Sequence, residues 1–186
     1  PKENIDRAIK KSLDKDTVNY DQMRYEGFGP NGTSIIVEAL TDNRNRTASN
    51  VRSAFQKFGG SMGETGSVSH AFNHYGFVRY NKDVTSEEDF FNFSIEGGAE
   101  DCFIEEDTYE AVSTPETLSN LYNYLDKKFG EPVSSGFQWK PVTYVAIEGD
   151  KLKSLINLLN ELDNDEDVQQ VFSNFEASDE ELAKFA

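Results

Sequence analysis

RYEGFGPNGTSIIVEALTDNRNRTASNVRSAFQKFGGSMGETG, at residues 24–66, is the stretch that decides the fold of this 186-residue chain. The run at 33–40 is apolar and rich in β-branched residues, and a glycine-rich turn precedes it, so it predicts a buried strand. Apolar residues then recur at helical spacing from Val51 to Phe58, and two adjacent glycines follow as at a helix end. The stretch therefore predicts a strand at 33–40 and a helix at 46–58.

Two arginines stand at the start of this predicted helix, where the aligned peptide dipoles favour a negative charge. Arg44 and Arg46 would each destabilise the helix by roughly a few tenths of a kcal/mol unless an anion lies nearby. Two sources of that anion stay open. One is an external phosphate, and the other is an internal carboxylate from Asp42, Glu38 or Glu26.

The basic surface continues along the helix and into the glycine-rich segment after it. Arg52 and Lys57 lie off the apolar stripe, so we expect their side chains to be exposed and not packed into the core. The glycines form either a backbone nest for a phosphate or a mobile loop, and they lack the Lys-Ser/Thr of a P-loop. The candidate nucleic-acid-binding residues are Arg44, Arg46, Arg52, Lys57, Gly60, Gly63 and Gly66.

Charge is distributed unevenly along the chain, whose formal net charge is −16. Residues 1–82 contain 12 Lys and Arg against 9 Asp and Glu, a net charge of +3, whereas residues 83–186 carry −19. The second part would repel a phosphate backbone, so any contact with DNA or RNA belongs to the first. The acidic part has three interpretations: it binds a basic protein partner, keeps the protein off non-specific nucleic acid, or adds solubility.

Catalytic and metal-binding patterns are missing from the sequence. Cys102 is the single cysteine, and Ser67 does not stand in the G-x-S-x-G context of a nucleophile elbow. His70 and His74 would be about 13 Å apart on a predicted strand, too far to share a metal. We therefore expect no enzymatic activity, no metal site and no cofactor.

No run approaches the roughly 18 to 20 consecutive apolar residues that cross a bilayer, so we expect no membrane partner. A single thiol cannot form an internal disulfide, which fits a reduced cytoplasm. We therefore expect a cytoplasmic protein. The sequence does not decide its oligomeric state.

Two compact units are predicted along the chain. The first contains the strand and helix above, is interrupted at about residues 76–140, and resumes with a second helix for which Asp150 is the expected N-cap. Its predicted elements are strands at 33–40, 67–72, 142–147 and 168–175 and helices at 46–58 and from residue 150.

The inserted unit contains the helix with the clearest end signals. Thr114 is placed to cap this helix, Pro115 takes its first position, and Gly130 closes it. The other predicted elements are a hairpin of strands at 101–104 and 109–113 and a later strand that carries Phe137 and Trp139.

Several blocks of the sequence closely resemble the YebC family. They are PKENIDRAIKK at 1–11, RYEGFGPNG, LTDNRNRT and VRSAF within 24–55, the glycine segment with Glu64, Ser67 and Val68, and DEDVQQVFSNFE at 165–176. The resemblance favours a helix for the ambiguous FFNFSIEGG at 90–98. It also implies a further N-terminal region rich in Lys and Arg, so we expect a chain truncated within its N-terminal helices.

Together these observations predict an α+β fold of two ferredoxin-like, βαββαβ-type units, the second inserted into the first. The expected divisions are the end of an N-terminal helical region at 1–19, a discontinuous domain at 20–75 and 141–176, an inserted acidic domain at 76–140, and a tail at 177–186. In the tail, Ser178 and Glu181 resemble a capping box.

The resemblance also implies a function. Proteins of this family are described as bacterial transcriptional regulators, with mitochondrial relatives that act on translation. We therefore expect a non-enzymatic, DNA-binding transcriptional regulatory protein. The alternative is a translation factor that binds ribosomal or messenger RNA through the same basic surface.

Overall fold

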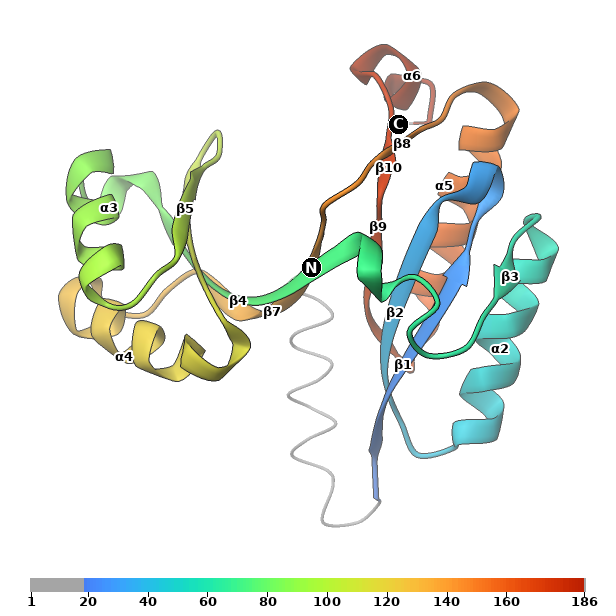
Figure 1. Ribbon diagram of the computed structural model, residues 1–186, viewed down its shortest axis with the longest axis horizontal. Helices are drawn as coiled ribbons and strands as arrows, with labels where there is room; N and C mark the ends of the chain where they lie inside the picture. The colour runs from blue at the N-terminus through green and yellow to red at the C-terminus, as the bar shows by residue number, and fades with distance from the viewer. Residues whose placement is uncertain (1–18, 186) are drawn as a thin grey trace. The chain divides into compact units, whose positions relative to one another are not determined.

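The computed structural model describes residues 19–185, which fold into two compact units (Figure 1). The first unit combines the described residues up to Asn73 with those from Pro141 onward, and the second runs from His74 to Lys140. Both units are α+β and the second is inserted into the first, which confirms the predicted fold class. The helical region predicted at 1–19 lies outside the described residues, except for its last position.

The first unit is built on an antiparallel sheet with the strand order β3-β1-β2-β9. The strands of this unit are β1 (Asp21–Phe28), β2 (Ser34–Thr41), β3 (Ser61–Met62) and β9 (Val168–Ser173), and a separate parallel pair is formed by β8 (Val145–Ala146) and β10 (Phe175–Glu176). Its helices are α2 (Arg44–Lys57), α5 (Gly149–Asn164) and α6 (Asp179–Ala183), and its short 3-10 helices are η2 (Pro30–Gly32) and η3 (Ser69–Ala71).

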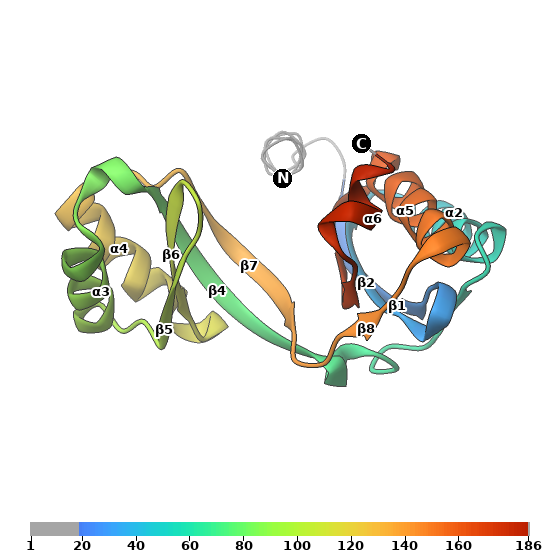
Figure 2. The same cartoon turned by 90° about the horizontal axis from the view of Figure 1, so that it is seen from above.

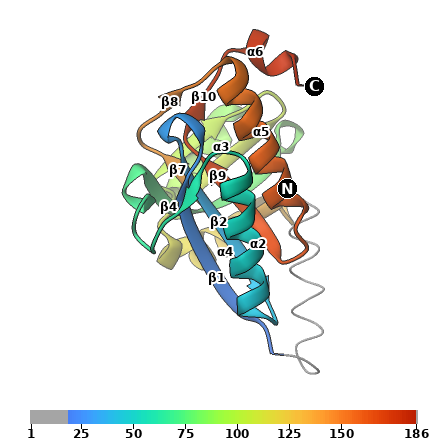
Figure 3. The ribbon, with the colours of Figure 1, turned by 90° about the vertical axis from the view of Figure 1, so that its right-hand side faces the viewer.

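Two helices cover one face of this sheet, where α2 and α5 lie side by side (Figure 3). Phe55 of α2 and Leu155 of α5 are fully buried there against Ile35 and Val37 of β2. Alternate residues of a strand point to the same face, so Ile35 and Val37 meet the helices together. The apolar stripe of each helix therefore forms a shared core with the sheet.

Local capping sets the ends of α2. The side chain of Asn43 accepts a hydrogen bond of 3.1 Å from the backbone N–H of Arg46, which starts the helix two residues before the predicted position. At the other end Gly59 has φ of +82°, and Gly60 N–H donates to the Phe55 carbonyl at 2.8 Å. This is a Schellman ending, so the glycine pair closes the helix as predicted.

The second unit has the ferredoxin-like strand order β5-β6-β4-β7. Its elements are β4 (Phe72–Asn81), α3 (Glu87–Glu96), β5 (Asp101–Ile104), β6 (Thr108–Ser113), α4 (Leu118–Phe129) and β7 (Ser134–Pro141), with 3-10 helices η4 (Lys82–Val84) and η5 (Pro115–Thr117). Phe90 of α3 and Leu121 of α4 pack with Val78 and Ala111 of the sheet, so both helices cover the same face (Figure 2).

Most elements of the second unit are confirmed. Residues 90–96 of the segment 90–98 are helical within α3, and its two glycines form the turn that follows. β5 and β6 form the predicted hairpin, and α4 ends at Gly130, whose φ is +83°. The side chain of Thr114 accepts from the backbone N–H of Thr117, but the turn that it caps is η5, which leads into α4.

Several predicted elements of the first unit are wrong. The strand predicted at 67–72 is instead the η3 turn, and only Phe72 belongs to a strand. β1 is absent from the predicted elements, so the unit begins with a hairpin and not with a strand followed by a helix. The strand predicted at 142–147 shrinks to β8, and Asp150 lies inside the first turn of α5, whose N-cap is Glu148.

We expect Leu155→Ala to lower the free energy of unfolding of the first unit by about 2–5 kcal/mol, because the fully buried side chain leaves a cavity. Amide hydrogen exchange of β2 measures the loss of protection. Lys153→Ala, at an exposed position of the same helix, is the matched control and should stay within about 0.5 kcal/mol. Equal protection in both variants would contradict the placement of Leu155 in this core.

Candidate nucleic-acid interface

The outer face of α2 is basic and polar. Residues 43–63 contain four Lys and Arg and no Asp or Glu. Helical spacing places one line of residues opposite the buried Val51, and every member of this line is exposed. We call this line the outer stripe of α2; it consists of Asn45, Ser49, Arg52 and Gln56. Amide, hydroxyl and guanidinium groups of this kind donate hydrogen bonds to phosphate oxygens.

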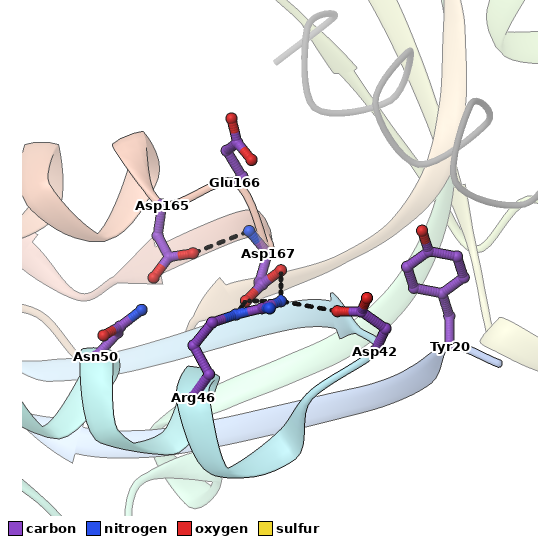
Figure 4. A pocket seen from close by; sticks show the side chains of 7 residues that line it. All are labelled: Tyr20, Asp42, Arg46, Asn50, Asp165, Glu166 and Asp167. Carbon is purple, nitrogen blue, oxygen red and sulfur yellow. Dashed lines mark hydrogen bonds and ion pairs between the residues drawn. The ribbon is translucent and has the colours of Figure 1, made fainter. Parts of the chain in front are cut away.

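Arg46 is bound by internal carboxylates (Figure 4). Its Nε lies 3.1 Å from Asp167 Oδ2, and its Nη2 lies 2.9 Å from Asp167 Oδ1 and 2.8 Å from Asp42 Oδ1. Hydrogen bonds from Arg46 to Asp42 and Asp167 raise the pKa of the guanidinium. Of the two anion sources left open for Arg46, the structure contains the internal one.

Asp167 is buried, with 6% of its surface exposed, and it stands directly before β9. The Thr47 hydroxyl lies 2.8 Å from its Oδ2, so the carboxylate contacts two consecutive residues of α2. A buried carboxylate that loses its cation is destabilising, because it remains as an uncompensated buried charge. Arg46 is therefore held in place by the fold.

A pocket of about 600 Å³ surrounds this pair at the start of α2 (Figure 4). Four of its lining side chains are carboxylates and one is a guanidinium; the lining residues are Tyr20, Asp42, Arg46, Asn50, Asp165, Glu166 and Asp167. The excess of negative charge would repel a phosphate. The pocket is therefore unsuited to the nucleic-acid contact that the sequence predicts at Arg46.

Two further cations of α2 form exposed ion pairs. Arg44 Nε lies 3.0 Å from Asp21 Oδ2, and Lys57 Nζ lies 2.8 Å from Glu161 Oε1. Solvent-exposed pairs of this kind contribute about 0–1 kcal/mol, so a phosphate can replace the carboxylate at little cost. Arg52 is exposed and forms no ion pair with another residue in the range 19–185.

The glycine-rich segment already holds an anion, and that anion is Glu26. Its carboxylate accepts hydrogen bonds from the backbone N–H groups of Gly66, Val68 and Ser69 at 2.8, 3.1 and 2.7 Å. Arg24 Nε lies 3.2 Å away, and Glu26 is 1% exposed. The backbone nest considered in the sequence analysis therefore exists, and a side chain of the same unit occupies it.

Burial by itself would raise the pKa of Glu26, because an apolar surrounding disfavours the charged form. The three backbone N–H donors, followed by the charge of Arg24, outweigh burial and hold the pKa below its ordinary value. Glu26 is thus a stable anion that fixes the segment after α2 to β1.

The candidate glycines have structural roles. A Cβ at Gly60 would lie 2.3 Å from the Phe28 carbonyl oxygen, and one at Gly63 would lie 2.7 Å from Ser67 Oγ. Gly66 has φ of +93°, which L side chains rarely adopt. Close backbone packing and the Glu26 contact therefore account for these three positions without an external ligand.

The structure gathers the predicted basic residues on one helix, but sequence reasoning missed most of their partners. Asp42 was among the proposed internal carboxylates and does contact Arg46. Asp167, Asp21 and Glu161 were not proposed. Asp167 and Glu161 are more than 100 positions away from their partners, so no local spacing signals them.

None of the helices between residues 19 and 185 has the length and apolar character that a membrane crossing needs. Within the same range, no group of three or more His, Cys, Asp and Glu is arranged to hold a metal ion.

The fold and the basic helix define a two-unit α+β protein, in which an acidic ferredoxin-like unit is inserted in the sequence of a unit that carries a basic surface helix. The chain belongs to the TACO1/YebC family, because the family model for the TACO1/YebC second and third domain, named for transcriptional regulation, matches residues 20–175. It is also similar to the crystal structure of the conserved hypothetical protein Aq1575 from Aquifex aeolicus. The two share 38% identity and a TM-score of 0.79 over 96% of this chain and 74% of that chain.

We expect Glu26→Gln to destabilise the first unit by about 1.5–3 kcal/mol at pH 7, because an amide cannot accept from three N–H donors as a carboxylate does. The depressed pKa of Glu26 means that its contribution is full above the ordinary value of 4.5 and is lost as pH falls through the lower folded value. Urea unfolding of both proteins across pH 3 to 7 measures the difference in stability. A difference that does not shrink at acid pH would contradict the assigned role.

Proposed function

We propose that this chain is a nucleic-acid-associated regulator of gene expression that catalyses no reaction, and that it binds DNA phosphates as a transcriptional regulator. Membership of a family named for transcriptional regulation supports the general class. The observation that carries the proposal is the outer face of α2, because residues 43–63 contain four cations and no Asp or Glu in a chain of net charge −16, and within the described residues three of the four are unpaired or held only by an exposed ion pair.

The four cations have different roles in this proposal. Arg52 on the outer stripe binds phosphate directly, since it forms no ion pair in the range 19–185. Arg44 and Lys57 exchange an exposed carboxylate for a phosphate at little cost. Arg46 stays with Asp167 and fixes the start of the helix.

The proposed contact positions nucleic acid and does not read its sequence. Phosphate contacts set register and orientation, whereas sequence is read at base edges or through DNA shape. Asn45 and Gln56 are short polar side chains on a helix that is fixed to its own sheet, and both point outward. They suit hydrogen bonds to the backbone of a duplex.

We expect Arg52→Ala and Lys57→Ala each to reduce the slope of log K against log salt by about 0.9 on duplex DNA, because each removes one phosphate contact. Fluorescence anisotropy of a labelled duplex, with the intact chain and salt between about 50 and 200 mM, measures the slope. Lys153→Ala removes the same charge from an exposed site on α5 and should leave the slope unchanged.

Unchanged slopes for Arg52→Ala and Lys57→Ala would show that this surface is wrong. The alternative function, in translation, is tested by a parallel titration with ribosomal RNA at the same salt concentrations. Binding to RNA without measurable binding to the duplex, lost in the same two variants, would replace transcription with translation and keep the surface.

A further inference from the structure

A long part of the second unit has no basic residue. Residues 83–126 contain 13 Asp and Glu and no Lys, Arg or His. This segment includes α3, β5 and β6 and runs into α4. Such a surface repels nucleic acid and attracts cations, so it calls for a partner different from the one proposed for α2.

Three large apolar side chains are exposed within this acidic segment. Phe91 and Ile95 of α3 are 48% and 44% exposed, and Ile104 at the end of β5 is 41% exposed. Phe91 and Ile95 stand four positions apart, so they are neighbours on the helix surface. We call these three residues the α3–β5 patch.

The packing of α3 places Phe91 and Ile95 on its side away from α4. Phe93 faces α4, because its ring centroid lies 5.7 Å from that of Phe129. Glu96 also faces α4 and accepts a hydrogen bond from the Tyr124 hydroxyl. Phe91 and Ile95 therefore point away from α4. The helix α3 contacts β5, which is the edge strand of its sheet (Figure 1).

Ile104 belongs to the same patch. It shares a face of the sheet with Cys102, two residues earlier, which packs against the core beneath α3. After the short loop that follows α3, β5 runs back along the helix. The three-residue step from Asp101 to Ile104 covers about 10 Å, comparable to the roughly 7.5 Å from Glu96 back to Phe91. Ile104 therefore lies toward the same end of α3 as Phe91.

Carboxylates flank one end of the patch. Glu87 and Glu88 are exposed one turn before Phe91, and the turn after Ile104 consists of the exposed Glu105, Glu106 and Asp107. An apolar centre with a charged rim is the usual anatomy of a protein-binding site. Here the five charged residues named beside the patch are all acidic.

We propose that the α3–β5 patch docks a cationic, amphipathic segment of a partner protein. Its apolar side chains cover Phe91, Ile95 and Ile104, and its Lys or Arg side chains meet the carboxylates of the rim. Charge complementarity selects this occupant. A nucleic acid or a second acidic copy of the chain would place like charges together at the same rim.

The test uses the intact chain and a fluorescein-labelled peptide of Lys and Leu at helical spacing, with binding measured by anisotropy. We expect Phe91→Ser combined with Ile95→Ser to weaken peptide binding about tenfold, because the peptide loses the apolar surface that it buries. Val133→Ser removes a side chain that is 57% exposed elsewhere in the same unit, and it should change affinity less than about twofold. Circular dichroism confirms that each variant is folded.

The contribution of charge to peptide binding is tested with two double variants, one in the rim and one outside it. Glu87→Gln with Glu88→Gln should reduce the salt dependence of peptide binding, whereas Glu116→Gln with Glu131→Gln, at exposed sites outside the rim, should not. Equal binding of a scrambled peptide, or equal effects of the two pairs, would reduce the interaction to net charge and overturn the proposal. Self-association or RNA binding that Phe91→Ser abolishes, without an effect on the peptide, would overturn it as well.

Discussion

The first unit depends on the contact between Asp167 and the start of α2. The unit is discontinuous, so the residues before the insertion must be joined to those after it without help from chain connectivity. Asp167 strengthens this joint beside the pairing of β2 with β9, because its carboxylate contacts Arg46 and Thr47 while its carbonyl accepts from the backbone N–H of Leu40 at 2.8 Å. One buried residue thereby connects β9 to both β2 and α2.

Glu26 performs the same task on the segment that follows α2. The N–H groups of Gly66, Val68 and Ser69 converge on its carboxylate, as they would on a bound phosphate. Both features that resemble anion sites in the sequence, the helix start and the glycine segment, are thus occupied by side chains of the protein itself. What remains for an external anion is the outer stripe of α2 with its exposed neighbours Arg44 and Lys57.

The sequence predicts elements well where their signals are local. α4 lies between Thr114-Pro115 and Gly130, and its apolar stripe is unbroken, so its position follows from neighbouring residues alone. β1 was missed because its glycine and charged residues do not alternate as an ordinary strand does, and its Glu26 is buried only through a contact with residues 66–69. The segment at 67–72 resembles a strand in the sequence for the same reason. Its backbone turns so that the N–H groups of Val68 and Ser69 donate to Glu26, which is distant in the sequence.

The candidate site follows the same division. The spacing in the sequence predicts that four cations lie on one helix. It does not predict which of them are available to bind phosphate. Arg46 and Arg52 are both basic residues of one helix, but Arg46 binds the nearby Asp42 and the distant Asp167, and no local spacing signals the second contact. The acidic second unit is similar: its charge is visible in composition, whereas the exposed position of Phe91 and Ile95 on α3 depends on where α4 packs.

A double-mutant cycle on Arg46 and Asp167 tests the central claim most directly. Urea unfolding of Arg46→Ala, Asp167→Ala and the double variant gives the coupling free energy between the two side chains. We predict a coupling of at least about 1 kcal/mol, since Asp167 is buried although part of the guanidinium is screened by solvent. Additivity within about 0.3 kcal/mol would show that the pair does not join the two halves of the unit.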